Sequence, residues 1–499
     1  MTINFTDTLA TPVADNATSI WPVHCDRDQL LITLRRAAEQ ASRQGHQILA
    51  SFTFPVPQCD PLRFFIAFKS LNMGDRFFWG RPADRRILVG VGAVTTIETT
   101  GPAHVTNAIA AWRALHRDCV ATQALGKTPA HTSGPILFGG FSFDPLSQRT
   151  PLWEGYPDGL LILPRLLFHW NGYCAALTIN QMIQPSTSIE SYATKITSTV
   201  QRLCTLVEDT AQSESEEEGA PPQHFTEHNL LSPAEWMARV DSVVGQIRRG
   251  AFSKVVLARA VAMTNDKSSF DVATTLYRLR ESYPGAYVFA IQRGTRYFVG
   301  ATPERLVCGT DGQVQTVALA GSAPRGATEE EDLRLGAELL QSAKNQEEHQ
   351  YVVATIREAL SSLCTSVQVA NPPHLRQLQN IQHLETTITG DLQAGRSILE
   401  TIEDLHPTPA VGGVPRQSAL EAIRSQEGMD RGWYAAPIGW VGASGNGEFA
   451  VALRSALIDG NQATLFAGCG IVADSKPESE YAESCWKLQV MQRALCGND

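Results

Sequence analysis

The last stretch of the chain places acidic and basic side chains at helical spacing. Glu480, Glu483 and Lys487 lie at positions i, i+3 and i+7, so a helix would bring all three to one face. Carboxylates are the ligands that Mg²⁺ prefers, and a neighbouring lysine could hold an anionic substrate. Taken alone, the same spacing is more typical of a solvated Glu–Lys surface.

Three further charged residues stand where chemistry is possible. Glu348 lies one turn before Val352, at the edge of an apolar helical stripe, and Lys254 heads an apolar strand. Burial would lower the pKa of Lys254 and make it a usable general base, and Glu304, at a strand end, could act as the acid. The ordinary interpretations are an exposed helix glutamate, an exposed lysine and a carboxylate in a turn.

A glycine-rich segment near the C-terminus gives a weaker signal. Gly468-Cys469-Gly470-Ile471-Val472-Ala473 matches the loose dinucleotide-binding pattern after a strand. No second βαβ half follows, which excludes a Rossmann site. The backbone N–H groups around Gly468 and Gly470 could still hold a carboxylate.

Composition limits the class of protein. The chain has 499 residues, 43% hydrophobic and 18% charged, with a net charge of −10. This balance favours a large globular core and disfavours a nucleic-acid or anionic-membrane partner. No apolar run is long enough to span a membrane, and the N-terminus lacks signal-peptide character. The ten cysteines include no Cys-x-x-Cys pair, so we expect reduced thiols and a cytoplasmic location.

The elements that must position these residues alternate irregularly along the chain. Apolar runs such as 64–68, 86–95, 160–169, 254–263 and 447–459 predict strands. Helical periodicity predicts helices over 27–44, 104–124, 188–209, 232–249, 332–363, 396–403 and 477–496. Runs of strands with inserted helices predict an α+β fold with large antiparallel sheets. The acidic segment 213–222 predicts an exposed loop that divides the chain into 1–215 and 216–499.

Taken in order, the motifs from about Phe252 to Leu495 resemble the chorismate-utilising enzymes. The matching stretches are FSKVVLAR, GATPERL, ALAGSAPRG, SAKNQEEH, IQHLETTITG, LHPTPAVGGVPR, YAAPIGWVG, VALRSAL, AGCGIV and PESEYAESCWK. The family includes isochorismate synthases, salicylate synthases and the synthase subunits of anthranilate and aminodeoxychorismate synthesis. The segment 135–144 resembles the N-terminal region of the menaquinone-pathway isochorismate synthases.

The resemblance implies one elaborated α+β domain, with two large antiparallel sheets packed face to face and helices outside. It implies chorismate as substrate and Mg²⁺ as cofactor, held by Glu348 and Glu483, with Glu480 one turn away. Asn345 departs from the family pattern, because some members carry a carboxylate at this position. Lys254 would be the base that activates water at C2, and Glu304 the acid at the C4 hydroxyl.

The resemblance also implies a substrate-binding set. Its members hold the two substrate carboxylates, line the wall of the site or stand beside the ring: Ser322, His383, Ala410, Tyr434, Arg454, Gly468, Gly470 and Lys487.

Three residue positions separate the family's activities. Amine-adding members typically carry Gln in place of Lys254, and aminodeoxychorismate synthases carry a lysine in place of Ala320. An isochorismate synthase is therefore favoured, and no glutaminase subunit is expected. Salicylate synthases typically carry Thr in place of Ala410, so salicylate synthesis is the alternative, together with isochorismate supply for a catecholate siderophore. A binding or scaffold protein with a degenerate site is disfavoured, because every site residue is present.

Overall fold

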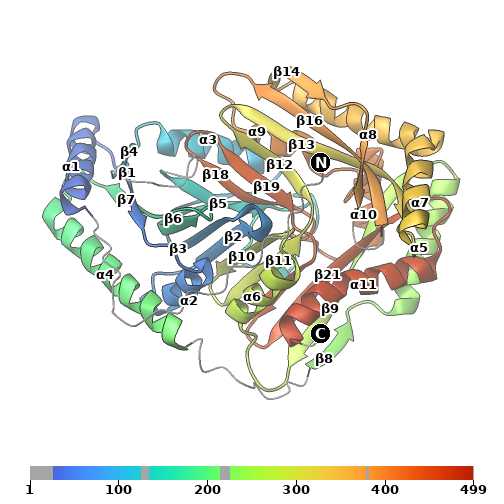
Figure 1. Ribbon diagram of the computed structural model, residues 1–499, viewed down its shortest axis with the longest axis horizontal. Coiled ribbons are helices and arrows are strands. Elements are labelled where there is room, and N and C mark those ends of the chain that lie inside the picture. Colours follow the sequence, from blue (N-terminus) through green and yellow to red (C-terminus); the bar gives the residue numbers. More distant parts are fainter. Residues whose placement is uncertain (1–25, 125–133, 214–224, 378–380, 498–499) are drawn as a thin grey trace, which may run out of the picture.

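The computed structural model describes residues 26–124, 134–213, 225–377 and 381–497 (Figure 1). In these ranges 21 strands form one hydrogen-bonded network, and every pairing is antiparallel except that of β1 (Ile48–Val56) with β4 (Val120–Gln123). Most of the predicted acidic loop at 213–222 lies outside the described residues.

The network has two arms that share β6 (Gly159–Trp170). The first arm continues from β6 through β5 (Ile136–Phe141), β18 (Pro437–Gly442), β19 (Gly447–Val451), β12 (Arg305–Thr310), β13 (Gln313–Pro324) and β16 (Ile381–Leu392), which also pairs with β14 (Cys364–Val369) and β15 (His374–Gln377). The second arm continues through β3 (Arg86–Thr99), β2 (Arg76–Arg81), β10 (Tyr287–Arg293), β11 (Arg296–Thr302), β20 (Ser455–Asp459), β21 (Gln462–Ile471) and β9 (Lys254–Asn265), which also pairs with β8 (Phe225–Asn229) and β17 (Gly413–Val414). On its other side, β6 pairs with β7 (Ala175–Ile183), and β7 pairs with β1.

The two arms pack face to face over a shared apolar core. This core contains Phe138 of the first arm and Phe77 of the second, whose rings stack at 6.2 Å. The Tyr287 hydroxyl of β10 donates to Glu448 of β19 at 2.9 Å, so one buried hydrogen bond also joins the layers. The α+β fold with two packed antiparallel layers is thus confirmed. Strands on both sides of residue 215 pair with one another, β2 with β10 and β5 with β18.

Helices cover the outside of these layers. They are α1 (Arg27–Gln44), α2 (Pro61–Leu71), α3 (His104–His116), α4 (Ile189–Ser213), α5 (Pro233–Arg248), α6 (Val272–Ser282), α7 (Glu329–Gln341), α8 (Ala343–Ser361), α9 (Ile398–Leu405), α10 (Arg416–Gln426) and α11 (Pro477–Cys496). Figure 1 shows α1, α2 and α4 on the outer side of the N-terminal strands, and α11 along β21. A second apolar cluster fills the space beneath many of these helices. None of the described helices is long and apolar enough to cross a membrane.

Four predicted elements differ from the structure. The predicted helix 104–124 ends at His116, the last residue of α3, and Val120–Gln123 form β4. The predicted strand 447–459 is two strands, β19 and β20, because the left-handed backbone of Arg454 interrupts it. The predicted strand 64–68 lies inside α2, where the side chain of Asp60 accepts from the Leu62 amide and Pro61 occupies the first turn. The predicted helix 332–363 is two helices, α7 and α8. Ser342 interrupts it with extended backbone, and its side chain caps α8 by accepting from the Asn345 amide.

Candidate active site

Lys254 is the first residue of β9, between β21 on one edge and β17 on the other. Its side chain is half-buried. Burial lowers the pKa of Lys254 below its usual range, and nearby Lys487 lowers it further, whereas the carboxylates of Glu348 and Glu304 raise it. The predicted base thus interacts electrostatically with the predicted acid Glu304, the predicted metal ligand Glu348 and the predicted substrate-binding residue Lys487.

Glu304 lies where the chain crosses from the second arm to the first, between β11 and β12. Its backbone carbonyl accepts from the Val451 amide at 3.0 Å. Burial raises the pKa of the Glu304 carboxyl, against the lowering effect of Lys254, Arg454 and the Thr408 hydroxyl. A carboxyl with a raised pKa holds its proton, as a general acid must.

Arg454 lies on a second segment that crosses between the arms, from β19 to β20. This segment lies beside the crossing that carries Glu304. The Arg454 carbonyl accepts from the Ala301 amide at 3.1 Å. The backbone of Arg454 is left-handed, with φ of 49°, which is uncommon for a residue with a Cβ atom. Burial lowers the pKa of Arg454, against the raising effect of Tyr434, Glu483 and Glu304, and burial raises the pKa of Tyr434. The arginine thus places a positive charge beside the acid.

The two glycines of β21 leave space for neighbouring side chains. A Cβ atom at Gly470 would lie 3.2 Å from Cε of Lys254, and one at Gly468 would lie 3.2 Å from the Tyr434 hydroxyl. Pairing of β20 with β21 ends at Phe466, so β20 does not cover this edge at the glycines. The Gly468 carbonyl there accepts from Nζ of Lys487 at 2.9 Å.

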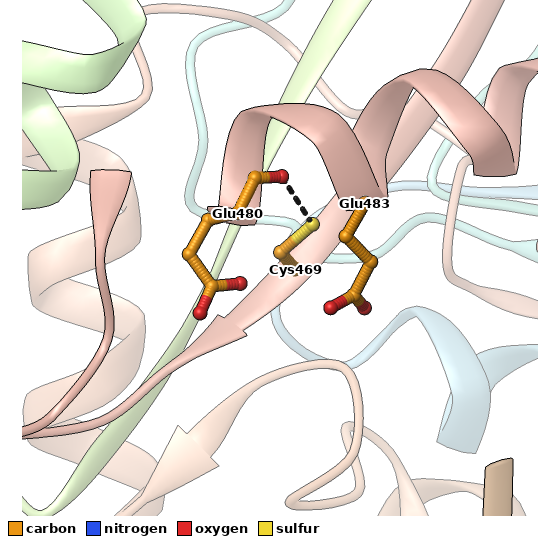
Figure 2. A group of neighbouring side chains, drawn as sticks. All are labelled: Cys469, Glu480 and Glu483. Atoms are coloured by element: carbon orange, nitrogen blue, oxygen red, sulfur yellow. Dashed lines mark hydrogen bonds between the residues drawn. The ribbon is translucent and has the colours of Figure 1, made fainter. Parts of the chain in front are cut away.

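Figure 2 shows Glu480 and Glu483 on the first turns of α11, on either side of Cys469. One ligand atom from each residue lies within 4.8 Å of the others. Burial raises the pKa of the Cys469 thiol to about 12, and its Sγ donates to the Glu480 carbonyl at 3.2 Å. A protonated thiol is not a metal ligand, so the carboxylates alone offer ligand atoms, and these suit a hard cation such as Mg²⁺.

The charges of these two carboxylates are incompletely balanced by protein groups. Burial and the neighbouring Glu483 raise the pKa of Glu480, while a hydrogen bond of 2.8 Å from Ser475 lowers it. Glu483 pairs with Lys487 at 2.5 Å. A bound cation would stabilise both carboxylates, so the residues present fit the group. Glu348 is exposed on α8 and is not part of this three-residue group.

The remaining predicted residues lie on β13, on β16 and in the loop between α9 and β17. Ser322 pairs with His383 across β13 and β16, next to a bulge at Gly321. Burial lowers the pKa of His383, and the positive charges of Lys254 and Lys487 lower it further. A Cβ atom at Gly321 would lie 3.1 Å from Cβ of Asn345, so the bulge packs closely against the start of α8. Ala410 is exposed, two residues after Thr408.

Four polar residues near this site were not predicted from the sequence. They are Arg376, Thr408, Glu427 and Arg431, which contact or electrostatically influence the groups above. Buried Glu427 and Arg431 are spaced i, i+4 in a short charged stretch. That spacing was visible in the sequence, but it is also typical of a solvated helix.

Comparison with known proteins identifies the family. A family model described as "Chorismate binding enzyme" matches residues 36–496. The chain belongs to this family. Isochorismate synthase MenF of Bacillus subtilis (strain 168) is 37% identical over 463 residues, covering 92% of this chain and 96% of that protein. The salicylate biosynthesis isochorismate synthase of Pseudomonas aeruginosa is 36% identical, covering 93% of each chain.

Solved structures agree with this assignment. MenF, the menaquinone-specific isochorismate synthase from Escherichia coli, superposes with a TM-score of 0.71 at 27% identity, over 93% of this chain and 100% of that chain. Anthranilate synthase component I from Streptococcus pneumoniae TIGR4 has a TM-score of 0.63 at 22% identity, over 82% of this chain and 92% of that chain, and shares the fold.

Proposed function

We propose that this member of the chorismate-binding family is an isochorismate synthase. The observation that supports the proposal is the electrostatic interaction between Lys254 and Glu304. Burial lowers the pKa of the first and raises that of the second, and each lies in the field of the other. Opposite shifts at two neighbouring groups are what one base and one acid in a single step require.

The reaction replaces the C4 hydroxyl of chorismate with a hydroxyl at C2 that comes from water. Neutral Lys254 takes a proton from the water that adds at C2, and the ring double bonds shift. The C4 hydroxyl leaves as water after Glu304 protonates it. Nothing is oxidised or reduced. One proton enters at Lys254 and one leaves at Glu304, so the pair must be reset through solvent before the next turnover.

Cationic groups and backbone amides would hold the two carboxylates of the substrate. Arg454 and Lys487 supply the charges, and the uncovered edge at Gly468 and Gly470 offers backbone groups. Tyr434 is buried beside Gly468 and forms part of the wall. Positioning by several such groups is worth far more than one contact, because it fixes the reacting carbon relative to both proton-transfer groups.

Mg²⁺ is the proposed cofactor. Glu483 and Glu348 would hold it, with Glu480 beside them. When bound, the ion would anchor a substrate carboxylate and stabilise negative charge. Lys487 would then be released from Glu483 to face the substrate.

Menaquinone supply is the favoured pathway, and salicylate formation is the second candidate. The first is supported by the likeness to the two MenF proteins, and the second by the 36% identity to an enzyme of salicylate biosynthesis. Ala410 favours release of isochorismate, because it has no hydroxyl group to hold the enolpyruvyl group for elimination. A cytoplasmic location and the lack of a glutaminase subunit stay expectations.

Product analysis tests the proposal. Purified protein is incubated with chorismate and Mg²⁺, and the products are separated by chromatography. We expect isochorismate in reversible equilibrium with chorismate, and no product with Lys254→Ala. Stoichiometric pyruvate and salicylate would establish the second candidate, and anthranilate formed with added ammonia would refute the argument from Lys254.

A further inference from the structure

The strand that carries Lys254 changes neighbours along one edge. β8 pairs with β9 from Asn265 to Val261, and the two-residue β17 pairs with it at Val255 and Lys254. Between these stretches, no described strand pairs with this edge of β9. Backbone groups left there must find other partners, because an unpaired buried N–H or C=O group is costly.

Two side chains fill the gap. The Ala258 amide donates to Oε1 of Glu427 at 2.8 Å, and Nη2 of Arg431 donates to the Val256 carbonyl at 2.8 Å. Glu427 and Arg431 also pair with each other, with Nε of Arg431 2.8 Å from Oε2 of Glu427. They are 5% and 3% exposed. The ion pair therefore takes the place of a neighbouring strand, and supplies one acceptor and one donor where β17 and β8 do not reach.

The same arginine also holds the 406–412 loop. Nη1 of Arg431 donates to the Val411 carbonyl at 2.9 Å, and its guanidinium lies 4.1 Å from the centre of the Phe143 ring. Val411 is three residues after Thr408, whose hydroxyl acts on Glu304, and follows Ala410 directly. One guanidinium thus joins the strand of the base to the loop that carries Thr408, which lowers the pKa of the acid.

We propose that Glu427 and Arg431 are a positioning pair that sets Lys254 relative to Glu304 and the 406–412 loop. This inference rests on the proposed function, because it assigns both residues to the same proton-transfer step. Neither residue touches the reacting atoms. The planar guanidinium donates to two carbonyls and a carboxylate from nitrogens held in a rigid fork, and the compact ammonium of lysine has no such arrangement of donors.

Arg431→Lys and Glu427→Gln test the proposal by steady-state kinetics with chorismate. Arg431→Lys keeps a cation beside Glu427, so no buried carboxylate is left without a charge partner. A shift of the base by a fraction of an ångström to 1 Å costs up to about 100-fold in rate. We expect kcat to fall roughly 10- to 100-fold in the folded variants, with KM changed less than about threefold.

Amide hydrogen exchange measures the contact of Glu427 and Arg431 with β9 in the absence of substrate. In Glu427→Gln and Arg431→Lys, the amides of Val256 to Ala258 should exchange faster, while those of β10 and β11 keep the wild-type rate. A purely structural pair would lower the unfolding midpoint without affecting kcat of the folded protein. Wild-type kcat in both folded variants, or unchanged exchange in this segment, would overturn the proposal.

Asp144→Asn is the matched control. Asp144 is also buried and forms an ion pair with Arg424 of α10, at 2.5 Å and 3.0 Å, but bonds no residue of β9. We expect a lower unfolding midpoint and kcat within about twofold of wild type. An equal loss of kcat in this control would contradict a specific positioning role. If the wild-type protein forms no isochorismate, the proposed function fails, whereas the exchange result still tests the contact.

Discussion

Gly470→Ala would place one methyl group against the proposed base. The new Cβ atom would lie 3.2 Å from Cε and 3.8 Å from Nζ of Lys254. The backbone of Gly470 is not left-handed, and the residue is exposed, so alanine fits the strand. Because the closest atom belongs to the end of a flexible side chain, Lys254 would move and the strand would not.

The size of the effect follows from this geometry. A contact of 3.2 Å between carbon atoms is a few tenths of an ångström closer than the usual optimum, so the amine must shift by about that distance. A misplacement of about 1 Å can cost 100-fold in rate. A smaller shift, with a methyl group added where a substrate carboxylate would approach, should cost about tenfold in kcat/KM. This equals about 1.4 kcal/mol of activation free energy.

The assay measures isochorismate formation together with thermal unfolding. We expect the loss in kcat/KM with an unfolding midpoint within about 2 °C of wild type, since an exposed strand position changes stability by about 0.5 kcal/mol or less. Gly285→Ala is the control, because its added Cβ atom would meet nothing within 4 Å. Full activity of Gly470→Ala would refute the placement of Lys254 beside the substrate.

The remaining predictions concern the metal, the proton-transfer pair and acid stability. Glu348→Gln and Glu483→Gln should each abolish Mg²⁺-dependent turnover at an unchanged unfolding midpoint; normal activity would remove that residue from the metal site. Lys254→Ala and Glu304→Gln should each cost at least about 100-fold in kcat, and their combination much less than the product of the two. Protonation of the Lys254 amine should cause the fall in rate at acidic pH, and ionisation of the Glu304 carboxyl should cause the fall at alkaline pH. Lys254→Ala should therefore remove the fall at acidic pH. Burial lowers the pKa of His169 to about 3, so the folded state binds fewer protons than the unfolded state. The contribution of neutral His169 to the free energy of unfolding is complete above about pH 6.5 and falls by about 1.4 kcal/mol per pH unit below it. In His169→Gln, the midpoint of urea unfolding should therefore depend less on pH between pH 8 and pH 5.5 than in the wild type.

Local signals predicted most helices and the antiparallel character of the sheets. The boundaries of α1 agree with the periodicity, because this helix carries a long amphipathic pattern. Those of α11 also agree with the prediction, and Pro477 in its first turn and Gly497 after its last turn mark its ends. The segment 64–68 was wrongly predicted as a strand, since a short apolar run fits a buried strand and a buried helix equally. The Asp60-Pro61 start signal would have decided the question. The break at Ser342 was also missed, because a capping serine inside a helical pattern resembles an ordinary surface serine.

The family resemblance predicted the site residues, but their shared environment needs the fold. The burial of Glu304 depends on the packing of both arms, and no feature of the GATPERL stretch reveals it. Thr408 and Arg376 lower the pKa of Glu304 from segments far apart in the sequence. Glu427 and Arg431 satisfy backbone groups of β9, so their role depends on a gap in strand pairing that only the structure reveals.

The acid and the arginine lie at two of the places where the chain crosses between the layers. Glu304 lies between β11 and β12, and Arg454 between β19 and β20. The crossings hold each other through the bonds from Val451 to Glu304 and from Ala301 to Arg454, of 3.0 Å and 3.1 Å. The base stands on the second arm alone. Any shift of one layer against the other therefore moves Glu304 and Arg454 together relative to Lys254, so the packing of the two arms sets the geometry of proton transfer.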